Sequence, residues 1–205
     1  MSLFITIEGG DGCGKTTQAD ILYKKLIASN FSAIRIAEPG GTPLGDELRN
    51  LLKRKWNGNI AAESELLLFN ASRKQLVAEV ILPALKKDIT VVCDRFSDST
   101  VAYQGYGRGL DLSTTETINR FATGGIKPDL TILLDMPVSE ALGRKQGKED
   151  DRFDSDDIAF HDRIRQGFLA LARKEAKRWV VINATQSVEQ ISTCIWEEVS
   201  RRLKR

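Results

Sequence analysis

A glycine-rich segment close to the N-terminus constrains the fold of this 205-residue chain more than any other feature. The apolar stretch 3–8 leads directly into residues 9–16 (GGDGCGKT), and a helical pattern begins near Lys15. Glycines allow the backbone to curl, so that successive amide N–H groups and the start of the helix point at phosphate oxygens. The spacing and the strand–loop–helix context therefore predict a P-loop that binds a nucleoside triphosphate.

Two side chains of this loop carry expected chemistry. We expect the Lys15 ammonium to contact the β- and γ-phosphates as a catalytic cation, and the Thr16 hydroxyl to bind Mg²⁺. Cys13 is interpreted as a small filler of the loop rather than as a redox switch. The other expected ATP contacts come from the loop and the residue after it: Gly9, Gly10, Asp11, Gly12, Cys13, Gly14 and Thr17.

Short apolar runs alternate with longer helical patterns along the rest of the chain. The apolar runs span residues 3–8, 33–37, 89–94, 130–135 and 179–182. Their nearly continuous apolar character is typical of strands that helices cover on both faces. The alternation predicts an α/β fold of the P-loop NTPase type, a doubly wound five-stranded parallel sheet flanked by helices. Because no repeat or long linker interrupts the pattern, we expect a single domain over residues 1–205.

Short motifs predict where several helices begin and end. Thr42, which a proline follows, is expected to cap one helix. The segments STTE and SVEQ, which begin at Ser113 and Ser187, match the capping box, in which side chains satisfy free backbone amides. Gly124 is expected to end the helix that follows Ser113.

The composition argues against several classes of partner. With a net charge of +2, the chain lacks the charge expected of a protein that binds nucleic acid. No apolar run approaches the roughly 20 residues needed to span a bilayer, so we expect no membrane segment. The three cysteines are far apart and lack metal-ligand spacing, which indicates free thiols in a reducing compartment. Because the N-terminus starts as a strand without a cleavage site, we expect a cytoplasmic protein.

Aspartates end two of the expected strands. Ligands of an open α/β sheet bind at the carboxyl ends of its strands, so we expect Asp94 to hold Mg²⁺, directly or through water, as a catalytic residue. A helix N-cap is the alternative role for Asp94. Asp135 ends another strand in the same way, and a cap or turn role is equally compatible with that position.

Four segments narrow the choice among the many functions of P-loop proteins. They are FITIEGGDGCGKTTQ (4–18), EPGGTPLGDELR (38–49), LLFNASRKQ (67–75) and DRFSDSTVAYQGYGRG (94–109). Together they closely resemble the thymidylate kinase family, and the similarity continues through residues 129–137 and 182–191. The resemblance implies ATP-dependent phosphorylation of dTMP to dTDP for dTTP synthesis, by in-line transfer with Mg²⁺. It also implies a homodimer, through helices near residues 43–52 and 66–82.

The resemblance assigns a group of residues to the thymine base of dTMP. Phe69 and Arg73 lie four positions apart and so share a face of the expected helix. By resemblance, Phe69 stacks on the thymine and Arg73 donates to its O4. Thr100 and Gln104 are expected to contact N3 and O2 of the base, with help from Ser99.

The remaining acceptor residues are expected at the sugar and the phosphate. By resemblance, the guanidinium groups of Arg49 and Arg95 bind the 5′-phosphate, and Arg95 also takes part in catalysis. Asp11 is expected to accept a hydrogen bond from the 3′-OH, and Tyr103 to exclude a 2′-OH. Glu38, which opens the EPGGT segment, is counted among the dTMP-binding residues.

The charged segment 143–156 (GRKQGKEDDRFDSD) is expected to form a short basic lid over the phosphates. Some members of the family carry a catalytic arginine in the P-loop, where this chain has Gly12 and Cys13. The corresponding charge is therefore expected from the lid. The candidates for it are Arg144, Lys145, Lys148 and Arg152. A plain surface loop is the alternative for the segment, and stacking on adenine is the alternative for Arg144.

Two other functions stay open at the level of sequence. The first is a kinase for a different nucleoside monophosphate, against which Phe69, Arg73 and Tyr103 argue. The second is a P-loop switch or ATPase module, which would need a water-positioning residue in place of an acceptor pocket. His161, the only histidine, is assigned to the surface or to helix packing, because an ionised phosphate needs no general base to attack.

Overall fold

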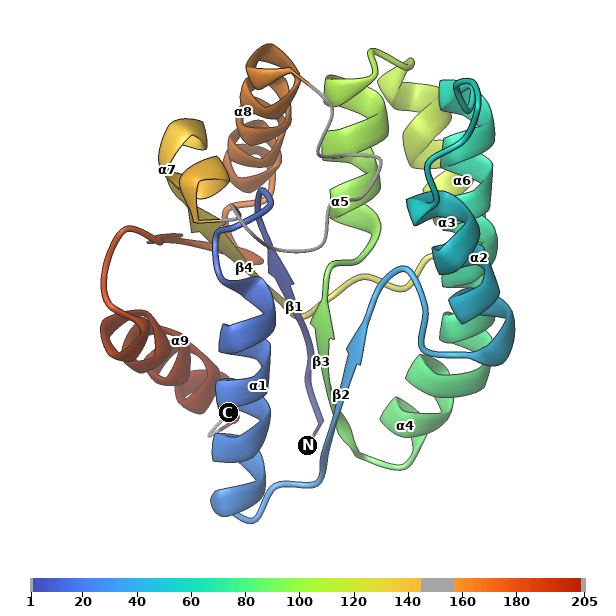
Figure 1. Ribbon diagram of the computed structural model, residues 1–205. Coiled ribbons are helices and arrows are strands. Elements are labelled where there is room, and N and C mark those ends of the chain that lie inside the picture. Colours follow the sequence, from blue (N-terminus) through green and yellow to red (C-terminus); the bar gives the residue numbers. More distant parts are fainter. Residues whose placement is uncertain (1, 145–156, 204–205) are drawn as a thin grey trace.

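The computed structural model describes residues 2–144 and 157–203, so Lys145, Lys148 and Arg152 of the expected lid lie outside the described residues. Its centre is a five-stranded parallel sheet in the order β2–β3–β1–β4–β5 (Figure 1). The strands are β1 (Phe4–Glu8), β2 (Ala33–Ala37), β3 (Thr90–Asp94), β4 (Leu130–Asp135) and β5 (Trp179–Asn183). Each strand coincides with one of the apolar runs to within one residue at either end, which confirms the predicted α/β fold.

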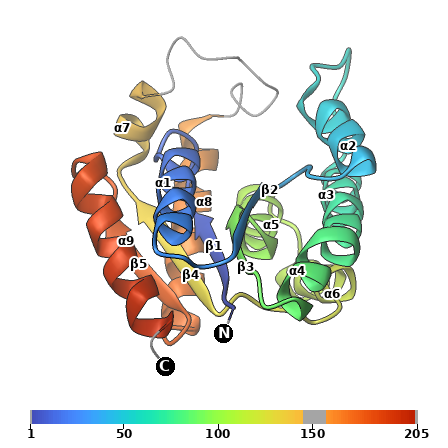
Figure 2. The same cartoon turned by 90° about the horizontal axis from the view of Figure 1, so that it is seen from below.

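Helices follow the strands and cover both faces of the sheet (Figure 2). The α-helices are α1 (Lys15–Ala28), α2 (Pro43–Lys53), α3 (Ala62–Leu76), α4 (Leu82–Lys86), α5 (Ser97–Thr100), α6 (Leu112–Thr123), α7 (Val138–Gly143), α8 (Ile158–Lys174) and α9 (Val188–Leu203). Two π-helical segments, η1 (Val77–Ile81) and η2 (Val101–Gly107), continue α3 and α5 without a break. Within residues 2–144 and 157–203, no helix is long and apolar enough to cross a bilayer.

Alternate residues of β1 enter two different cores, because successive side chains of a strand point to opposite faces. Ile5 and Ile7 pack with α1, α9 and the neighbouring strands. Phe4 packs on the other face, with η1, α4 and β3. Thr6 and Glu8 share the face of Phe4, and both are fully buried. This face therefore buries polar side chains close to the end of β1, where the glycine-rich loop begins.

Most of the predicted helix boundaries are confirmed by hydrogen bonds. The Thr42 side chain accepts from the Gly45 N–H at the start of α2. Ser187 and Gln190 exchange the two bonds of a capping box before α9, at 3.0 and 3.2 Å. Gly124 ends α6 in the left-handed conformation.

The prediction that Ser113 caps α6 is wrong. The helix begins two residues earlier than a Ser113 cap implies, at Leu112, and the Asp111 carboxylate accepts from the Thr114 N–H at 2.7 Å. Leu112 packs closely on Gly105 of η2, where a Cβ would lie 2.6 Å from the Leu112 Cδ2 atom. Because this contact places Leu112 in the first turn, the carboxylate before it becomes the cap.

Candidate active site

The P-loop joins β1 to α1 at the carboxyl edge of the sheet. Gly14 stands immediately before α1 with a φ of 92°, which lies in the left-handed region that favours glycine. Gly12 has a φ of 80°, and a Cβ placed there would lie 2.0 Å from the Ala141 carbonyl oxygen of α7. The glycine pattern of the sequence is therefore the one that this loop geometry requires.

Lys15 and Thr16 form the first turn of α1 and line a cleft. The buried Lys15 ammonium donates to the Gly10 carbonyl oxygen at 2.6 Å and lies 3.6 Å from Cys13 Sγ. The Thr16 hydroxyl donates to Asp94 Oδ2 at 2.5 Å, which joins the P-loop to the end of β3. A hydroxyl and a carboxylate of this kind suit Mg²⁺ that also binds substrate phosphates. No cluster of three or more His, Cys, Asp or Glu side chains among the described residues forms a metal site of its own.

The cleft has a volume of about 810 Å³ and extends from the P-loop to α2 and α3. This volume lies within the usual range of small-molecule sites, about 300–1,000 Å³. Its lining includes most of the site residues expected from the sequence: Asp11, Gly12, Gly14, Lys15, Thr16, Thr17, Glu38, Arg49, Phe69, Arg73, Asp94, Arg95, Ser99, Thr100, Tyr103 and Gln104. Residues expected at the donor and at the acceptor therefore share one cavity.

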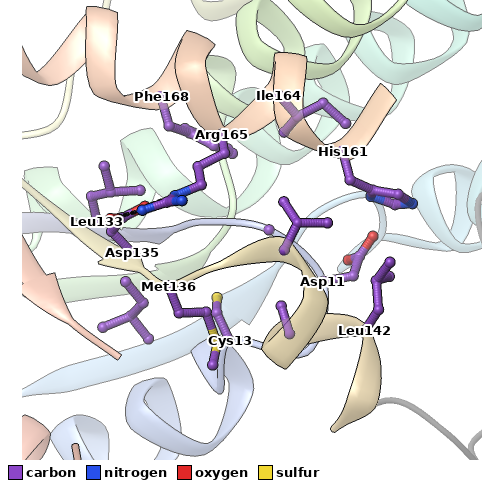
Figure 3. A pocket seen from close by; sticks show the side chains of 14 residues that line it. Asp11, Cys13, Leu133, Asp135, Met136, Leu142, His161, Ile164, Arg165 and Phe168 are labelled. Atoms are coloured by element: carbon purple, nitrogen blue, oxygen red, sulfur yellow. Dashed lines mark hydrogen bonds and ion pairs between the residues drawn. The ribbon is translucent and has the colours of Figure 1, made fainter. Parts of the chain in front are cut away.

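Among the expected site residues that the structure describes, four do not line this cleft: Gly9, Gly10, Cys13 and Arg144. Gly10 and Cys13 border a second cavity of about 30 Å³, into which side chains of α8 such as Ile164 point from the opposite side (Figure 3). Arg144 follows α7 and donates from Nη1 to the Ala184 carbonyl oxygen at 3.0 Å. Arg144 is therefore outside the lining of the cleft, with its guanidinium held at Ala184.

The cleft also contains residues that sequence reasoning missed, among them Arg35 and Asp46. Arg35 lies on β2 and forms an ion pair with Asp20 of α1 at 2.8 Å. The Asp46 carboxylate accepts from the Gly41 N–H at 2.9 Å and so closes the loop before α2. Asp46 could have been found from its place in the segment 38–49, whereas Arg35 lies inside a strand and gave no signal.

Asp135 forms an ion pair, which is neither the cap nor the turn role considered for it, and the position of His161 on α8 decides between the two roles considered for that residue. The Asp135 carboxylate accepts two hydrogen bonds from Arg165, at 2.7 and 2.9 Å, and so anchors α8 to the end of β4. His161 is buried and, together with Leu142 of α7, lines the small cavity between α7 and α8. Helix packing is therefore the observed role of His161, and the surface position is excluded.

Arg73 is the centre of a buried network at the wall of the cleft. Its side chain is 2% exposed and donates from Nε to Glu38 Oε2 at 2.8 Å. Burial raises the pKa of the Glu38 carboxyl, and the charge of Arg73 opposes this shift. The Arg73 guanidinium also donates to oxygens of Asn70, Phe96, Thr100 and Asn119. Phe69, one turn earlier on α3, lines the same cleft and is half-buried.

Arg95 follows β3 and links the P-loop to η2. Its Nη2 atom forms an ion pair with Asp11 and donates to the Tyr103 hydroxyl at 3.1 Å, while that hydroxyl donates to Asp11 Oδ2 at 3.2 Å. Nη1 donates to the Gly9 carbonyl oxygen at 3.1 Å and to Ser99 Oγ at 3.2 Å. Burial raises the pKa of Tyr103, so its hydroxyl remains a neutral donor.

The π-helical turn η2 presents neighbouring polar side chains to the cleft, as π-helical turns frequently do at functional sites. Tyr103 and Gln104 both belong to it, and both are buried. The Gln104 amide donates to Glu65 Oε1 of α3 at 2.7 Å, which fixes the amide orientation. Arg108 pairs with the same carboxylate, so the Glu65 charge is compensated.

Glu8 is another residue of this region that sequence reasoning missed. It ends β1, is 0% exposed and accepts hydrogen bonds from the Phe96 N–H at 2.7 Å and the Ser99 hydroxyl at 2.5 Å. Burial, reinforced by the nearby charge of Asp98, raises the pKa of Glu8 to about 8. Its donors lie 88 and 91 positions further along the chain, so no local pattern revealed the contact.

Comparisons with known proteins agree with this geometry. The family profile described as thymidylate kinase matches residues 7–195. The thymidylate kinase of Dehalococcoides mccartyi is 48% identical over 204 residues, which cover 100% of this chain and 99% of that protein. The thymidylate kinase of a Geobacter species is 44% identical over 211 aligned positions, which cover 100% of this chain and 94% of that protein.

A solved structure of a protein with the same name is also similar to this chain. The crystal structure of thymidylate kinase from Ehrlichia chaffeensis has 38% sequence identity and superposes with a TM-score of 0.74. The match covers 88% of this chain and 92% of that chain. The chain therefore belongs to the thymidylate kinase family.

Proposed function

We propose that this chain transfers the γ-phosphoryl group of ATP to dTMP and releases dTDP and ADP. The observation that carries the proposal is the single cleft, in which a P-loop shares one cavity with a buried arginine, Arg73, and an aromatic side chain, Phe69. Membership of the thymidylate kinase family supports the same activity. A switch or ATPase module needs the P-loop but not the part of the cleft that Phe69 and Arg73 line.

The thymine base is proposed to stack on Phe69, with its O4 accepting from Arg73. The Arg73 guanidinium also donates to Thr100 Oγ1 at 2.9 Å, which supports a place for Thr100 at the edge of the base. Gln104, and with it Ser99, are proposed to complete the contacts to N3 and O2. A base without matching groups would leave these buried polar atoms unpaired, which supports selection for thymine.

The 5′-phosphate is proposed to bind Arg95 and Arg49. Arg49 lines the cleft, and its Nη1 atom is anchored to the Pro39 carbonyl oxygen at 2.8 Å. Asp11 is proposed to accept from the 3′-OH, and Tyr103 to exclude a 2′-OH by its bulk. Hydrogen bonds among Asp11, Arg95 and Tyr103 support this assignment, because they bring the sugar and phosphate contacts together.

In the proposed reaction an oxygen of the dTMP phosphate attacks the γ-phosphorus of ATP in line, and the bond to the ADP oxygen breaks. The P-loop amides and Lys15 orient the donor phosphates and balance their charge. Thr16 and Asp94 are proposed to hold Mg²⁺, directly or through water, for neutralisation of the phosphates. Further positive charge is proposed to come from the segment after α7. Its candidates are Arg144, Lys145, Lys148 and Arg152.

We also propose that residues 1–205 act as one domain, because a single sheet runs through the described chain. The proposed compartment is the cytoplasm. All three cysteines are free thiols, which supports a reducing environment.

A panel of acceptors tests the proposed activity. With ATP and Mg²⁺, the purified protein is expected to convert dTMP with a kcat/KM about 100-fold or more above that for UMP, dCMP or dGMP. The physical reason is the buried hydrogen-bonding network around Arg73, which a mismatched base leaves unsatisfied. Chromatographic separation of the diphosphate products measures each rate.

Two outcomes of this panel would contradict the proposal in different ways. Equal rates for all acceptors would reject the selection for thymine while leaving a nucleoside monophosphate kinase. ATP consumption that no acceptor changes would point to a switch or ATPase module.

A homodimer is proposed through the helices α2 and α3, as the family resemblance implies, and we propose that α6, which packs on α3, extends this surface. These helices lie side by side at one edge of the molecule (Figures 1 and 2). Each carries a large apolar side chain that is exposed: Leu44 at 50%, Leu67 at 57% and Phe121 at 82%. Exposed apolar side chains on neighbouring elements are a common feature of surfaces that a second subunit covers.

Phe121→Asp is expected to shift the protein from a dimer to a monomer. A charge in place of the exposed ring would be buried without a partner at the proposed contact, which opposes association. Sedimentation velocity measures the change toward the mass of one chain, 22.8 kDa. Val188→Asp, at an exposed apolar position on α9, is the matched control and is expected to leave the dimer intact. A Phe121→Asp variant that remained dimeric would exclude α6 from the interface.

A further inference from the structure

The last residue of β1, Glu8, has no part in the proposed reaction, although it lies directly before the P-loop. Its carboxylate is completely buried on the face of the sheet that also buries Thr6. One oxygen accepts from the Phe96 N–H at 2.7 Å, and the other accepts from the Ser99 hydroxyl at 2.5 Å. Both donors belong to the short segment that follows β3.

The two donors connect Glu8 to Arg95 by separate routes. The first route is through the backbone: Arg95 has a φ of 70°, which is unusual for a residue with a side chain, and the next N–H is the one that Glu8 holds. The second route is through Ser99, whose Oγ atom donates to Glu8 and accepts from Arg95 Nη1 at 3.2 Å. The Glu8 carboxylate therefore holds the backbone next to Arg95 directly and the Arg95 guanidinium through Ser99.

A buried carboxylate at this position is costly for the fold. Burial and the charge of Asp98 disfavour the ionised form, and only part of this cost is offset by the Ser99 and Phe96 hydrogen bonds and the charge of Arg95. An apolar side chain at the end of a buried strand would avoid this cost, as Phe4 does at the start of β1. The placement of Glu8 therefore serves the groups that it holds rather than the packing of the sheet.

We propose that Glu8 is a positioning residue, which fixes Arg95 in the orientation that receives the phosphate of a nucleoside monophosphate. This inference rests on the proposed function, in which Arg95 binds the acceptor phosphate. Glu8 itself contacts no substrate, since it is covered by Phe96 and Ser99.

Binding of dTMP and of thymidine, which lacks the phosphate, separates a positioning role from a structural one. At pH 9, above the Glu8 pKa of about 8, the ionised carboxylate accepts from both Phe96 and Ser99. Glu8→Gln keeps the size of the side chain and an acceptor for the Phe96 N–H, but its NH₂ group cannot accept the Ser99 hydroxyl proton as the carboxylate does. By calorimetric titration at this pH we expect the Kd for dTMP to rise about 10-fold, since a charge-assisted contact to the phosphate is weakened. The Kd for thymidine is expected to stay within about twofold, because thymidine has no group for Arg95.

A matched variant controls for the disturbance of a buried polar site. Thr6→Val lies on the same face of β1, where the Thr6 hydroxyl is hydrogen-bonded to Thr131 Oγ1 at 2.9 Å. It is expected to change neither Kd. Ser99→Ala cuts the second route and also removes the contact proposed for Ser99 at the base. The ratio of the Kd for dTMP to the Kd for thymidine therefore reports the loss of the route, and it is expected to rise less in Ser99→Ala than in Glu8→Gln. The double variant Glu8→Gln/Ser99→Ala is expected to change the dTMP-to-thymidine Kd ratio by less than the product of the two single changes. The reason is that both substitutions act on one chain of hydrogen bonds.

Equal losses of dTMP and thymidine affinity in Glu8→Gln would overturn the proposal, since a general disturbance of the fold weakens both ligands. An unchanged Kd for dTMP would overturn it as well. If Glu8→Gln does not fold, an unchanged ratio of the two affinities in Ser99→Ala decides against it. Wild-type protein that bound dTMP no more tightly than thymidine would instead reject the assignment of Arg95, and with it part of the proposed function.

Discussion

Lys15→Ala is expected to lower kcat for dTMP phosphorylation by a factor of about 10³ or more. The ammonium lies inside the P-loop, 2.6 Å from the Gly10 carbonyl oxygen, and little of it is exposed. At this position it would neutralise charge that builds up between the β- and γ-phosphates during transfer. Water that enters the vacated space is a weaker substitute, because it has to reorient as the charge moves. A coupled assay of ADP release at saturating ATP and dTMP measures the loss.

Lys24→Ala is the control for this substitution. Lys24 belongs to the same helix, α1, but is exposed and far from the loop, so its removal is expected to leave kcat within about twofold. The assignment of Lys15 would be wrong if the kcat of Lys15→Ala stayed within tenfold of the wild-type value and so resembled the kcat of Lys24→Ala.

Arg73→Ala is expected to lower the free energy of unfolding by about 3–5 kcal/mol in addition to weakening dTMP binding. The side chain is 2% exposed, and its removal leaves the Glu38 carboxylate buried without its cation. It also leaves the acceptors on Asn70, Thr100 and Asn119 without this donor. Urea unfolding measures the stability, and calorimetric titration measures dTMP binding.

A double variant separates these two effects of Arg73. In Glu38→Gln/Arg73→Met no buried charge remains, so at least about half of the lost unfolding free energy is expected to return. Binding of dTMP is expected to stay weak, because the donor proposed for thymine O4 is still missing. If the double variant recovered dTMP affinity together with stability, Arg73 would act only through the fold.

The parts of this molecule that could be predicted from the sequence are those with local signals. A short apolar run marked each strand, and a fixed spacing of glycines before Lys15 marked the P-loop. The cap of α6 shows the limit of such signals. Asp111 and Ser113 both precede plausible first turns, and the contact of Leu112 with Gly105 of another helix decided between them.

The candidate site was predictable where family motifs marked its residues, but its network of contacts was not. Arg73 was expected to face the acceptor, yet its position at the centre of a buried network depends on acceptors from several separate segments. In the sequence, Glu8 is only the last residue of an apolar run and resembles any other strand end. Its partners become neighbours only when β1 pairs with β3, so the sequence around it contained no sign of them.

The contact between Gly12 and α7 restricts how this protein can change over evolution. The left-handed backbone and the Ala141 carbonyl oxygen both oppose a side chain at position 12. A single nucleotide change that introduced an arginine there would produce a collision before it produced a useful cation. Two segments more than a hundred residues apart would have to vary together, with α7 moving away first. A one-step change to an arginine at this position is therefore expected to strain the loop and to require a shift of α7.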